Sequence, residues 1–193
     1  MTRLAALAFA AALIAPAAAA DWTVDAARST LSFEVSAQGE PFTTVFKEWS
    51  AQISFDPADL STANATVTIN LMSADSGSRE RDGMMSSKSW FDAAGASFSA
   101  PVGVPAGQAV FQTTTFRQTG ETTYEADGML SMRDASKPVT LPFTLVITGG
   151  EAHMTGSVAI DRTQWGVGQG QYAGSDPVAT EVKINVDLIA TAN

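Results

Sequence analysis

Apolar and polar residues alternate along most of the chain beyond residue 29, as expected of β-strands with one buried face and one face in water. The alternation is strictest at 137–147, where apolar side chains occupy every second position: Val139, Leu141, Phe143, Leu145 and Ile147. The same pattern predicts further strands at 30–35, 45–55, 66–71, 109–117, 123–132, 152–160 and 181–190, and a short one at 97–100. Gly149-Gly150, between two of these strands, is typical of a hairpin turn.

The number and spacing of these strands predict an all-β fold. About eight antiparallel strands fit either a β-sandwich or a closed barrel. We favour the barrel, because closure leaves no strand edge exposed and several strands are long enough to wrap. No period of about 20–50 residues repeats along the chain, which argues against a solenoid or a propeller.

The alternation stops at 79–92, which reads R-E-R-D-G-M-M-S-S-K-S-W-F-D. Four residues spaced three or four apart share one side of a short helix: Arg81, Met84, Met85 and Lys88. Ser78 suits the N-cap position, and Lys88 suits the last turn. A helix this short persists only against an apolar surface. We therefore expect one short helical insertion that caps a barrel end and forms part of the entrance to an apolar cavity.

Residues 1–20 have the pattern of a cleaved secretory signal peptide. Arg3 precedes the apolar run 4–14, and Ala18-Ala19-Ala20 offers a small-residue cleavage site. The apolar run is short for a bilayer span, which disfavours a membrane anchor. We expect export to the periplasm, and a mature domain at 21–193 without a transmembrane anchor.

Charge and composition argue against several classes of function. The formal net charge is −9 at pH 7, so the chain repels phosphate backbones, and nucleic acid is not an expected partner. There is no cysteine, and the single histidine, His153, falls on the polar face of a predicted strand. Transition-metal binding and Ser-His-Asp catalysis lack their usual residues, and no G-x-S-x-G motif occurs. We expect no enzyme activity, no metal and no cofactor.

The architecture itself suggests a function. A barrel of eight strands is wide enough to be filled by its own side chains or to hold one slender ligand, and the sequence leaves both alternatives open. Its inward faces carry Leu, Ile, Val, Phe and Met, so any cavity is apolar. Each buried ligand methylene would contribute about 0.8 kcal/mol, which favours a chain-like lipid.

Five short motifs occur in order along the chain: Trp22-x-x-Asp25 with Ser29 and Phe33; Ile53-x-Phe55-Asp56-Pro57; Arg81-Asp82 with Ser87 and Trp90-Phe91-Asp92; Lys137-Pro138-Val139-Thr140-Leu141-Pro142; and Ile160-Asp161-Arg162 with Trp165-Gly166. Together they resemble the YceI-like family of periplasmic lipid-binding proteins and extend over nearly the whole mature chain. The resemblance implies a lipocalin-like barrel whose apolar tunnel holds a polyisoprenoid chain, such as the tail of a quinone or of an isoprenoid carrier lipid. The family commonly has histidine where this chain has Arg28, Met84 and Arg133, so its head-group preference could differ or be lost here.

Two groups of residues are candidates for the ligand site. The apolar tunnel candidates, for which core packing is the structural alternative, are Phe33, Trp49, Met84, Met85, Trp90, Phe91, Phe143, Trp165 and Ile184. The polar candidates, for which a salt bridge, a cap or a fixed turn is the alternative, are Arg81, Asp82, Asp161 and Arg162.

The leading hypothesis is non-enzymatic binding and carriage of a long-chain isoprenoid lipid by a periplasmic barrel, with a homodimer left open. One alternative is a small outer-membrane β-barrel, which would turn the apolar faces outward, although two tyrosines make a poor aromatic girdle. Another is a packed periplasmic barrel that acts as a stress-related interaction protein. An enzyme acting on a bound lipid is the remaining alternative.

Overall fold

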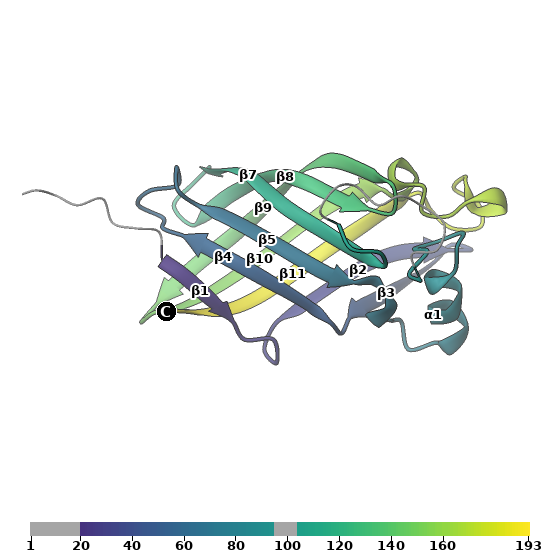
Figure 1. Ribbon diagram of the computed structural model, residues 1–193, viewed down its shortest axis with the longest axis horizontal. Coiled ribbons are helices and arrows are strands. Elements are labelled where there is room, and N and C mark those ends of the chain that lie inside the picture. The colour runs from purple at the N-terminus through teal and green to yellow at the C-terminus, as the bar shows by residue number, and fades with distance from the viewer. Residues whose placement is uncertain (1–19, 95–103) are drawn as a thin grey trace, which may run out of the picture.

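The computed structural model describes residues 20–94 and 104–193; the predicted leader, apart from Ala20, and the predicted strand at 97–100 lie outside them. The described residues form one antiparallel sheet curled into a closed barrel (Figure 1). Its strands are β1 Ala20–Val24, β2 Thr30–Ala37, β3 Glu40–Phe46, β4 Trp49–Phe55, β5 Asn64–Asn70, β6 Ala74–Asp75, β7 Gln108–Gln118, β8 Thr123–Met132, β9 Ala135–Thr148, β10 Glu151–Asp161 and β11 Glu181–Ala192. Its helical elements are the α-helix α1 Arg79–Ser86 and the 3-10 turns η1 Leu71–Ser73, η2 Arg162–Trp165 and η3 Gly170–Tyr172.

The strands pair antiparallel, and β11 returns to the start of the chain to close the barrel. β1 and β2 lie end to end along β11, where Trp22 faces Ala192 and Phe33 faces Ile184. β3 and β4 likewise lie end to end, as do β5 and β6. The 11 strand segments therefore occupy eight positions around the barrel. The predicted eight-stranded antiparallel barrel is confirmed, as is its one short α-helix among the described residues.

The prediction of one continuous strand at 45–55 is wrong, because the chain breaks at Lys47 and Glu48 into β3 and β4. At this break the Lys47 N–H donates to the Ser73 carbonyl at 3.1 Å, and the Glu48 N–H donates to Ser73 Oγ at 3.0 Å. These backbone groups thus bond to η1 instead of to a neighbouring strand. The hydropathy pattern also did not predict β1 or the first half of β3, which follows a turn at Gln38-Gly39 with positive φ at both residues.

Alternate residues face the interior, as predicted. On β9 the buried positions are Val139, Leu141 and Phe143, and the residues between them are exposed. On β7 a bulge between Thr113 and Thr115 shifts this alternation. Phe111 and Phe116, an odd number of positions apart, therefore both pack into the core.

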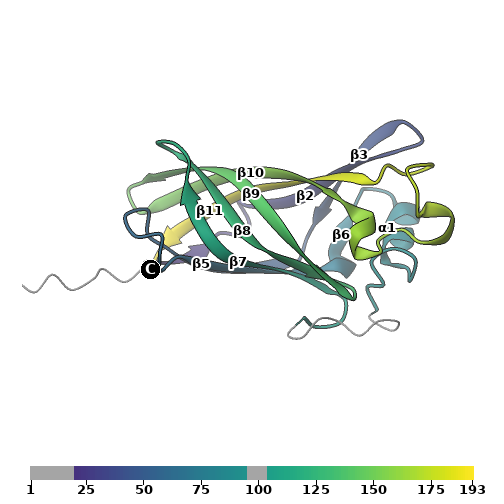
Figure 2. The ribbon, with the colours of Figure 1, turned by 90° about the horizontal axis from the view of Figure 1, so that it is seen from above.

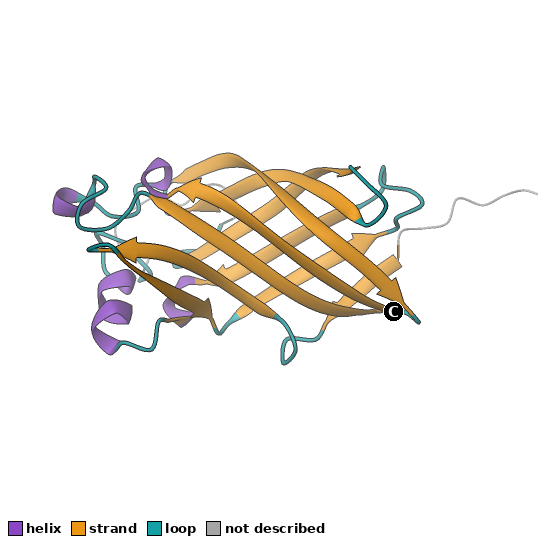
Figure 3. Ribbon diagram, turned by 180° about the vertical axis from the view of Figure 1, so that it is seen from behind, coloured by secondary structure: helices purple, strands orange, loops and turns teal. Residues whose placement is uncertain are grey.

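The core divides into two clusters along the barrel, which we call the mouth half and the closed half. The mouth half includes Phe33, Val35, Leu71, Met85, Trp90, Leu130, Trp165 and Val182. The closed half includes Trp22, Phe55, Tyr124, Leu141, Phe143 and Leu188, with Phe116 packed against them. Figure 2 shows α1 at one end of the barrel and the C-terminus at the other, and Figure 3 shows that the helical elements gather at the α1 end.

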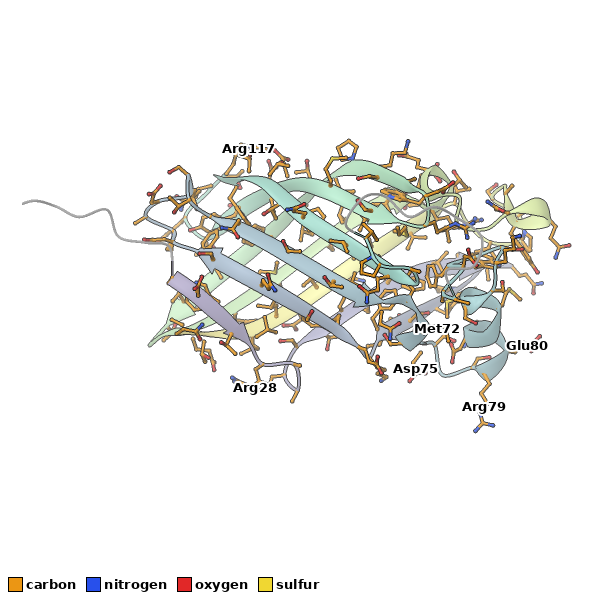
Figure 4. All side chains as sticks on the ribbon, viewed as in Figure 1. Arg28, Met72, Asp75, Arg79, Glu80 and Arg117 are labelled. Atoms are coloured by element: carbon orange, nitrogen blue, oxygen red, sulfur yellow. The ribbon has the colours of Figure 1, made fainter. Side chains whose placement is uncertain are left out.

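α1 begins as predicted, with Ser78 as its N-cap. The Ser78 side chain accepts a hydrogen bond from the Arg81 N–H at 3.5 Å. The helix ends before Lys88, so the prediction that placed this residue in the last turn is wrong. Met85 is buried against the barrel, whereas Arg79 extends away from it (Figure 4). The helix thus covers the mouth half with its methionines and directs Arg79 into solvent.

Candidate functional site

The mouth half contains a cavity of about 270 Å³. Its wall comes from seven strands, from α1 and from the residues just after α1, and it is almost entirely apolar. The apolar lining includes Leu31, Phe33, Val35, Phe42, Phe46, Ile69, Leu71, Met85, Phe91, Leu130, Val178, Val182 and Ile184. Among the described residues, the charged groups of the lining are the guanidinium groups of Arg81 and Arg162.

Three phenylalanine rings form one side of the cavity. The ring centroids of Phe33 on β2 and Phe46 on β3 are 5.6 Å apart. Phe91, just beyond α1, lies edge-on to Phe33 at 6.1 Å and 6.2 Å from Phe46. Aromatic pairs in such arrangements stabilise each other beyond their burial alone. The segment after α1 is therefore fixed over the open end of the barrel.

Trp90 forms another part of the wall. Its ring centroid lies 5.2 Å from that of Tyr172 in η3 and 5.1 Å from the guanidinium carbon of Arg162. Its backbone carbonyl accepts a hydrogen bond from Nη1 of Arg133, which also donates to the Lys88 carbonyl at 3.0 Å. Burial lowers the pKa of Arg133. Arg133 thus helps to hold the segment that carries Trp90.

Arg162 is 3% exposed and donates to four backbone carbonyls at 2.6 to 2.9 Å, those of Val167, Gly174, Val178 and Ala179. Burial lowers the pKa of its guanidinium, and the negative charge of Asp161 opposes that shift. Gly168 has a φ of +81°, and a Cβ there would collide with the guanidinium. Arg162 therefore fixes the connection between β10 and β11 while it also borders the cavity.

Arg81 and Asp82 both bind Ser76 in the turn before α1. Arg81 Nε donates to Ser76 Oγ at 3.2 Å, and Arg81 Nη2 donates to the Ser76 carbonyl at 3.1 Å. Asp82 accepts from the Ser76 N–H at 2.9 Å and from Ser76 Oγ at 2.7 Å. The Arg81 guanidinium also lies 5.0 Å from the centroid of the Phe42 ring. These contacts orient α1 over the mouth and leave Arg81 partly in contact with the cavity.

Asp161 is the N-cap of η2. Its carboxylate accepts hydrogen bonds from the Thr163 N–H at 2.9 Å and from Thr163 Oγ1 at 2.6 Å. These two bonds lower the pKa of Asp161. The residue therefore fixes the turn that carries Arg162.

The structure brings some of the predicted site residues together and separates others. The residues that line the cavity are Phe33, Met84, Met85, Trp90, Phe91, Ile184, Arg81 and Arg162. Trp165 lies deeper in the wall, where its Nε1 donates to the Leu130 carbonyl at 2.8 Å. Phe143 belongs to the closed half, and Trp49 lies beside a shallower pocket between β1 and β4. A role in ligand binding remains a prediction for all of these residues.

The positions at which the family commonly has histidine also lie apart. Met84 lines the cavity, and Arg133 supports the backbone of Trp90. Arg28 forms ion pairs with Asp25 at 2.7 Å and with Glu151 at 2.6 Å, next to the break between β1 and β2.

The cavity wall includes residues that were not predicted as ligand-site candidates. Val182 shares a face of β11 with Ile184, so alternation alone could have identified it. Phe42 lies in the part of β3 that was not predicted as a strand. Tyr172 and Val178 come from the glycine-rich connection before β11, where no periodic pattern points to them.

An antiparallel barrel whose strands follow one another in sequence, with an apolar cavity under a helical cap, defines the lipocalin-like class of barrels. The chain belongs to one family within this architecture, because the family model described as a YceI-like domain matches residues 22–190.

Relatives and solved structures agree with this assignment. The UPF0312 protein of Pseudomonas syringae pv. syringae is 32% identical over 146 residues, which span 73% of this chain and 71% of that protein. The crystal structure of Burkholderia cenocepacia BcnA has a TM-score of 0.79 and 31% identity, and the match covers 88% of this chain and all of that chain (100%). A third solved structure is described as a polyisoprenoid binding domain from Saccharophagus degradans implicated in plant cell wall breakdown. Its TM-score is 0.66, and the match covers 89% of this chain and 98% of that one. At 15% identity, this likeness shows the fold alone.

Two features are absent from the described residues. No helix there combines the length and the apolar character that a membrane span requires. No group of three or more His, Cys, Asp or Glu residues is placed to hold a metal ion within residues 20–94 and 104–193.

Proposed function

We propose that this protein binds a polyisoprenoid-type lipid, such as a quinone or an isoprenoid carrier, in the cavity of the mouth half, and carries it without catalysing a reaction. The observation that carries the proposal is the cavity itself: its wall is apolar, and the charged groups that border it are already hydrogen-bonded to the protein. The driving force is transfer of the lipid chain from water to this wall, with about 0.8 kcal/mol for each methylene buried.

The size and shape of the cavity suit a slender ligand. Its volume of about 270 Å³ is near the lower end of the range of ligand pockets, about 300–1,000 Å³. The wall of an eight-stranded barrel allows only a narrow space along its axis. A flexible chain can thread into such a space, and the two methionines at its edge, Met84 and Met85, adapt well to irregular apolar ligands.

The expected export supports a role in the periplasm. The pattern at 1–20 is typical of a secretory signal peptide, and the family match begins just after it, at residue 22. One barrel of the same fold, that of Saccharophagus degradans, is described as polyisoprenoid-binding. That description supports the proposal only by analogy of fold, whereas the apolar cavity is a property of this chain itself.

The alternatives fit the structure less well. An outer-membrane barrel needs an apolar outer surface. Here the outward positions of β10 and β11 include Thr155, Ser157, Lys183 and Asp187, all of which are exposed. A barrel that is packed throughout and acts only by surface contacts would not be expected to retain a cavity in the mouth half.

Native mass spectrometry tests the proposal. The chain 21–193 is purified from periplasm without detergent, and any adduct is extracted and fragmented. We expect an isoprenoid or quinone adduct. The substitution Ile184→Trp, which adds bulk to the cavity wall, should remove the adduct, whereas Val146→Trp, at an exposed position of β9, should retain it. A bare wild-type chain that stays bare after incubation with long-chain isoprenoid lipids would contradict the proposal.

A further inference from the structure

The wall of the barrel contains a gap between β1 and β4, which are neighbouring strands in Figure 1. The ladder between these strands ends where Trp22 faces Ile53, and the ladder between β2 and β3 does not begin until Ser32. A pocket of about 590 Å³ lies along this gap, bordered by residues of 21–26 on one side and of 49–54 on the other. We call this pocket the slot.

Backbone groups of β4 face the slot. The Asn70 N–H donates to the Glu48 carbonyl at 3.0 Å, so Glu48 and every second residue after it direct their backbone groups towards β5. Trp49 and Ala51 alternate with these residues and therefore direct their N–H and C=O groups towards the slot, which both of them line. Among the described residues, no strand pairs with β4 at these two positions on that side.

The opposite rim of the slot bends away from β4. The Asp25 N–H donates to the Ile189 carbonyl of β11 at 2.8 Å, which leaves the backbone groups of Val24 directed towards the slot. Arg28, in the turn after β1 (Figure 4), donates to Glu151 of β10 at 2.6 Å. These contacts fix the turn beside β10 and β11, so β1 does not continue along β4. The slot is therefore held open by specific contacts.

The rim of β4 lacks the features that normally protect a strand edge. Exposed edges tend to pair with other chains unless charged residues, proline or a bulge prevents it. The rim 49–52 reads W-S-A-Q, without charge or proline. Trp49 packs towards the core and Gln52 is exposed, and both border the slot, as the side chains beside an added strand would. Backbone donors and acceptors at the spacing of a strand are complementary to an extended peptide, whereas a lipid chain offers no such array.

The charge around the slot indicates which kind of peptide it fits. Two exposed cations lie beside its rims, Arg28 and Lys47, and each is paired with carboxylates. Asp21, which lines the slot, and Glu48, next to the rim of β4, have no ion-pair partner among the described residues. Lysine or arginine on the outward positions of a peptide would complement this excess of negative charge.

We propose that the slot binds an extended, basic segment of a partner protein, which adds a strand to the edge of β4. Backbone hydrogen bonds with Trp49 and Ala51 provide affinity, and the carboxylates beside the slot favour lysine or arginine. This interaction does not depend on lipid binding in the mouth half, because the slot and the cavity share no lining residue.

The substitution Ala51→Pro tests the backbone contact, because it removes an N–H that faces the slot and leaves the ladder to β5 intact. The probe is a synthetic hexapeptide of alternating lysine and valine. In equilibrium binding, Ala51→Pro should weaken its affinity roughly tenfold. Gln52→Ala is the matched control: it truncates an exposed side chain on the same rim and keeps every backbone group, so the affinity should stay the same. Equal losses in the two variants would overturn recognition through the backbone.

A second measurement uses the wild-type chain and does not depend on how a variant folds. With saturating peptide, the amide hydrogens of Trp49 and Ala51 should exchange with solvent roughly tenfold more slowly, whereas those of Ser50 and Gln52, already paired with β5, should not change. Unchanged exchange at Trp49 and Ala51 with the peptide bound would overturn the site. Slower exchange there at high protein concentration without peptide would assign the slot to a second copy of the chain and overturn the choice of partner.

Two altered peptides test the chemistry of the partner. Methylation of the valine backbone nitrogens removes the donors of one strand edge and should weaken binding roughly tenfold. Threonine in place of lysine keeps the backbone and should weaken binding less, with the difference vanishing at high salt. Unchanged affinity for the methylated peptide would overturn strand addition, and unchanged affinity for the threonine peptide would overturn the basic partner. Displacement of the peptide by an isoprenoid lipid would show that it had bound in the mouth half, which would overturn the slot as its site.

Discussion

The two halves of this barrel share strands β7 to β11 and differ in how their interiors are filled. In the closed half, neighbouring rings of Phe55, Phe116, Tyr124 and Phe143 have centroids 5.2 to 6.2 Å apart, and the pocket beside them measures only about 80 Å³. In the mouth half, the walls enclose about 270 Å³. Atoms that border an empty space lose dispersion contacts on that side. We infer that the closed half contributes most of the stability and that the mouth half gives up packing to hold a ligand.

The origin of the rings explains this difference. The rings of the closed half come from β4 and from the consecutive strands β7, β8 and β9, with β5 between β4 and β7, and they contact one another in the interior. Those that border the cavity come from β2, from β3 and from the segment after α1, and they lie against the wall and the cover. At the middle of the barrel Gly128 of β8 leaves room for Phe111, because a Cβ at this glycine would lie 2.7 Å from that ring.

The largest expected effect is on stability, when one phenylalanine in each half is truncated to alanine. Phe143 and Phe33 are both 7% exposed, but only Phe33 borders the cavity. Phe143→Ala should lower the free energy of unfolding by about 3–5 kcal/mol, and Phe33→Ala by about 2 kcal/mol, because its ring has fewer neighbours to lose. Urea denaturation of both variants provides the measurement.

In lipid binding the order of the two variants should be reversed, with the larger loss in the mouth half. Phe33→Ala should weaken it, whereas Phe143→Ala should leave it unchanged. Equal losses of stability, or weaker binding in Phe143→Ala alone, would show that the two halves do not divide these tasks.

Arg162 tests how far the mouth half depends on one side chain. Arg162→Met keeps a long apolar side chain but leaves four backbone carbonyls without their donor, which should lower the free energy of unfolding by about 3 kcal/mol. Arg117→Met is the control. Arg117 is exposed and paired with Glu125 and Asp127, and its loss should change stability by less than about 1 kcal/mol. Similar values for the two variants in guanidinium unfolding would contradict the structural role of Arg162.

The N-cap of α1, the helix that covers the mouth half, should have a smaller effect on stability. Ser78→Ala removes the N-cap of α1 and should lower the free energy of unfolding by about 1 kcal/mol. Ser86→Ala in the last turn of the same helix is the control, because Ser86 Oγ donates to the Gly83 carbonyl and alanine favours a helix. Thermal denaturation of both variants measures the effect, and a loss in Ser86→Ala as large as in Ser78→Ala would argue against the cap.

The smallest expected effect is the stabilisation by Asp161 and its dependence on pH. Hydrogen bonds from Thr163 lower the pKa of Asp161 below its ordinary value of 3.8. Because folding lowers this pKa, the carboxylate contributes its full stabilisation above the unfolded value, and that contribution is lost as the pH falls through the folded value. Asp161→Asn should therefore lower the free energy of unfolding by less than about 1 kcal/mol at neutral pH. The difference from the wild type should vanish at acid pH; a constant difference in unfolding free energy from neutral to acid pH would refute the assignment.

Much of the fold could be predicted because alternation is a local property. It identified the strands, the inward faces and the place where the barrel pattern stops. The break at Lys47 and Glu48 could not be predicted, because it depends on hydrogen bonds to Ser73, which is distant in sequence. The bulge in β7 likewise depends on contacts between strands: Thr113 Oγ1 accepts from the Ala65 N–H at 2.7 Å.

The site was harder to predict than the fold. Phe33 and Phe143 occupy equivalent positions in alternating strands, and no local pattern shows which of them borders a cavity. Whether each ring borders the cavity depends on its position along the barrel axis. The register and the tilt of the strands together determine that position. The polar residues near the mouth were singled out from motifs, but their partners, such as Ser76 and Thr163, became visible only in three dimensions.

Closure of the barrel has a consequence for how the chain folds as it is made. The first strand pairs with the end of the last, Trp22 with Ala192 and Val24 with Ala190. β1 therefore pairs with a segment that lies about 170 residues further along the chain. Until these two segments meet, the growing sheet has two unpaired edges, which are prone to pairing with other chains. Contacts between the ends of a sequence also form slowly, since a long loop must close first. Completion of this barrel is consequently a late step of folding.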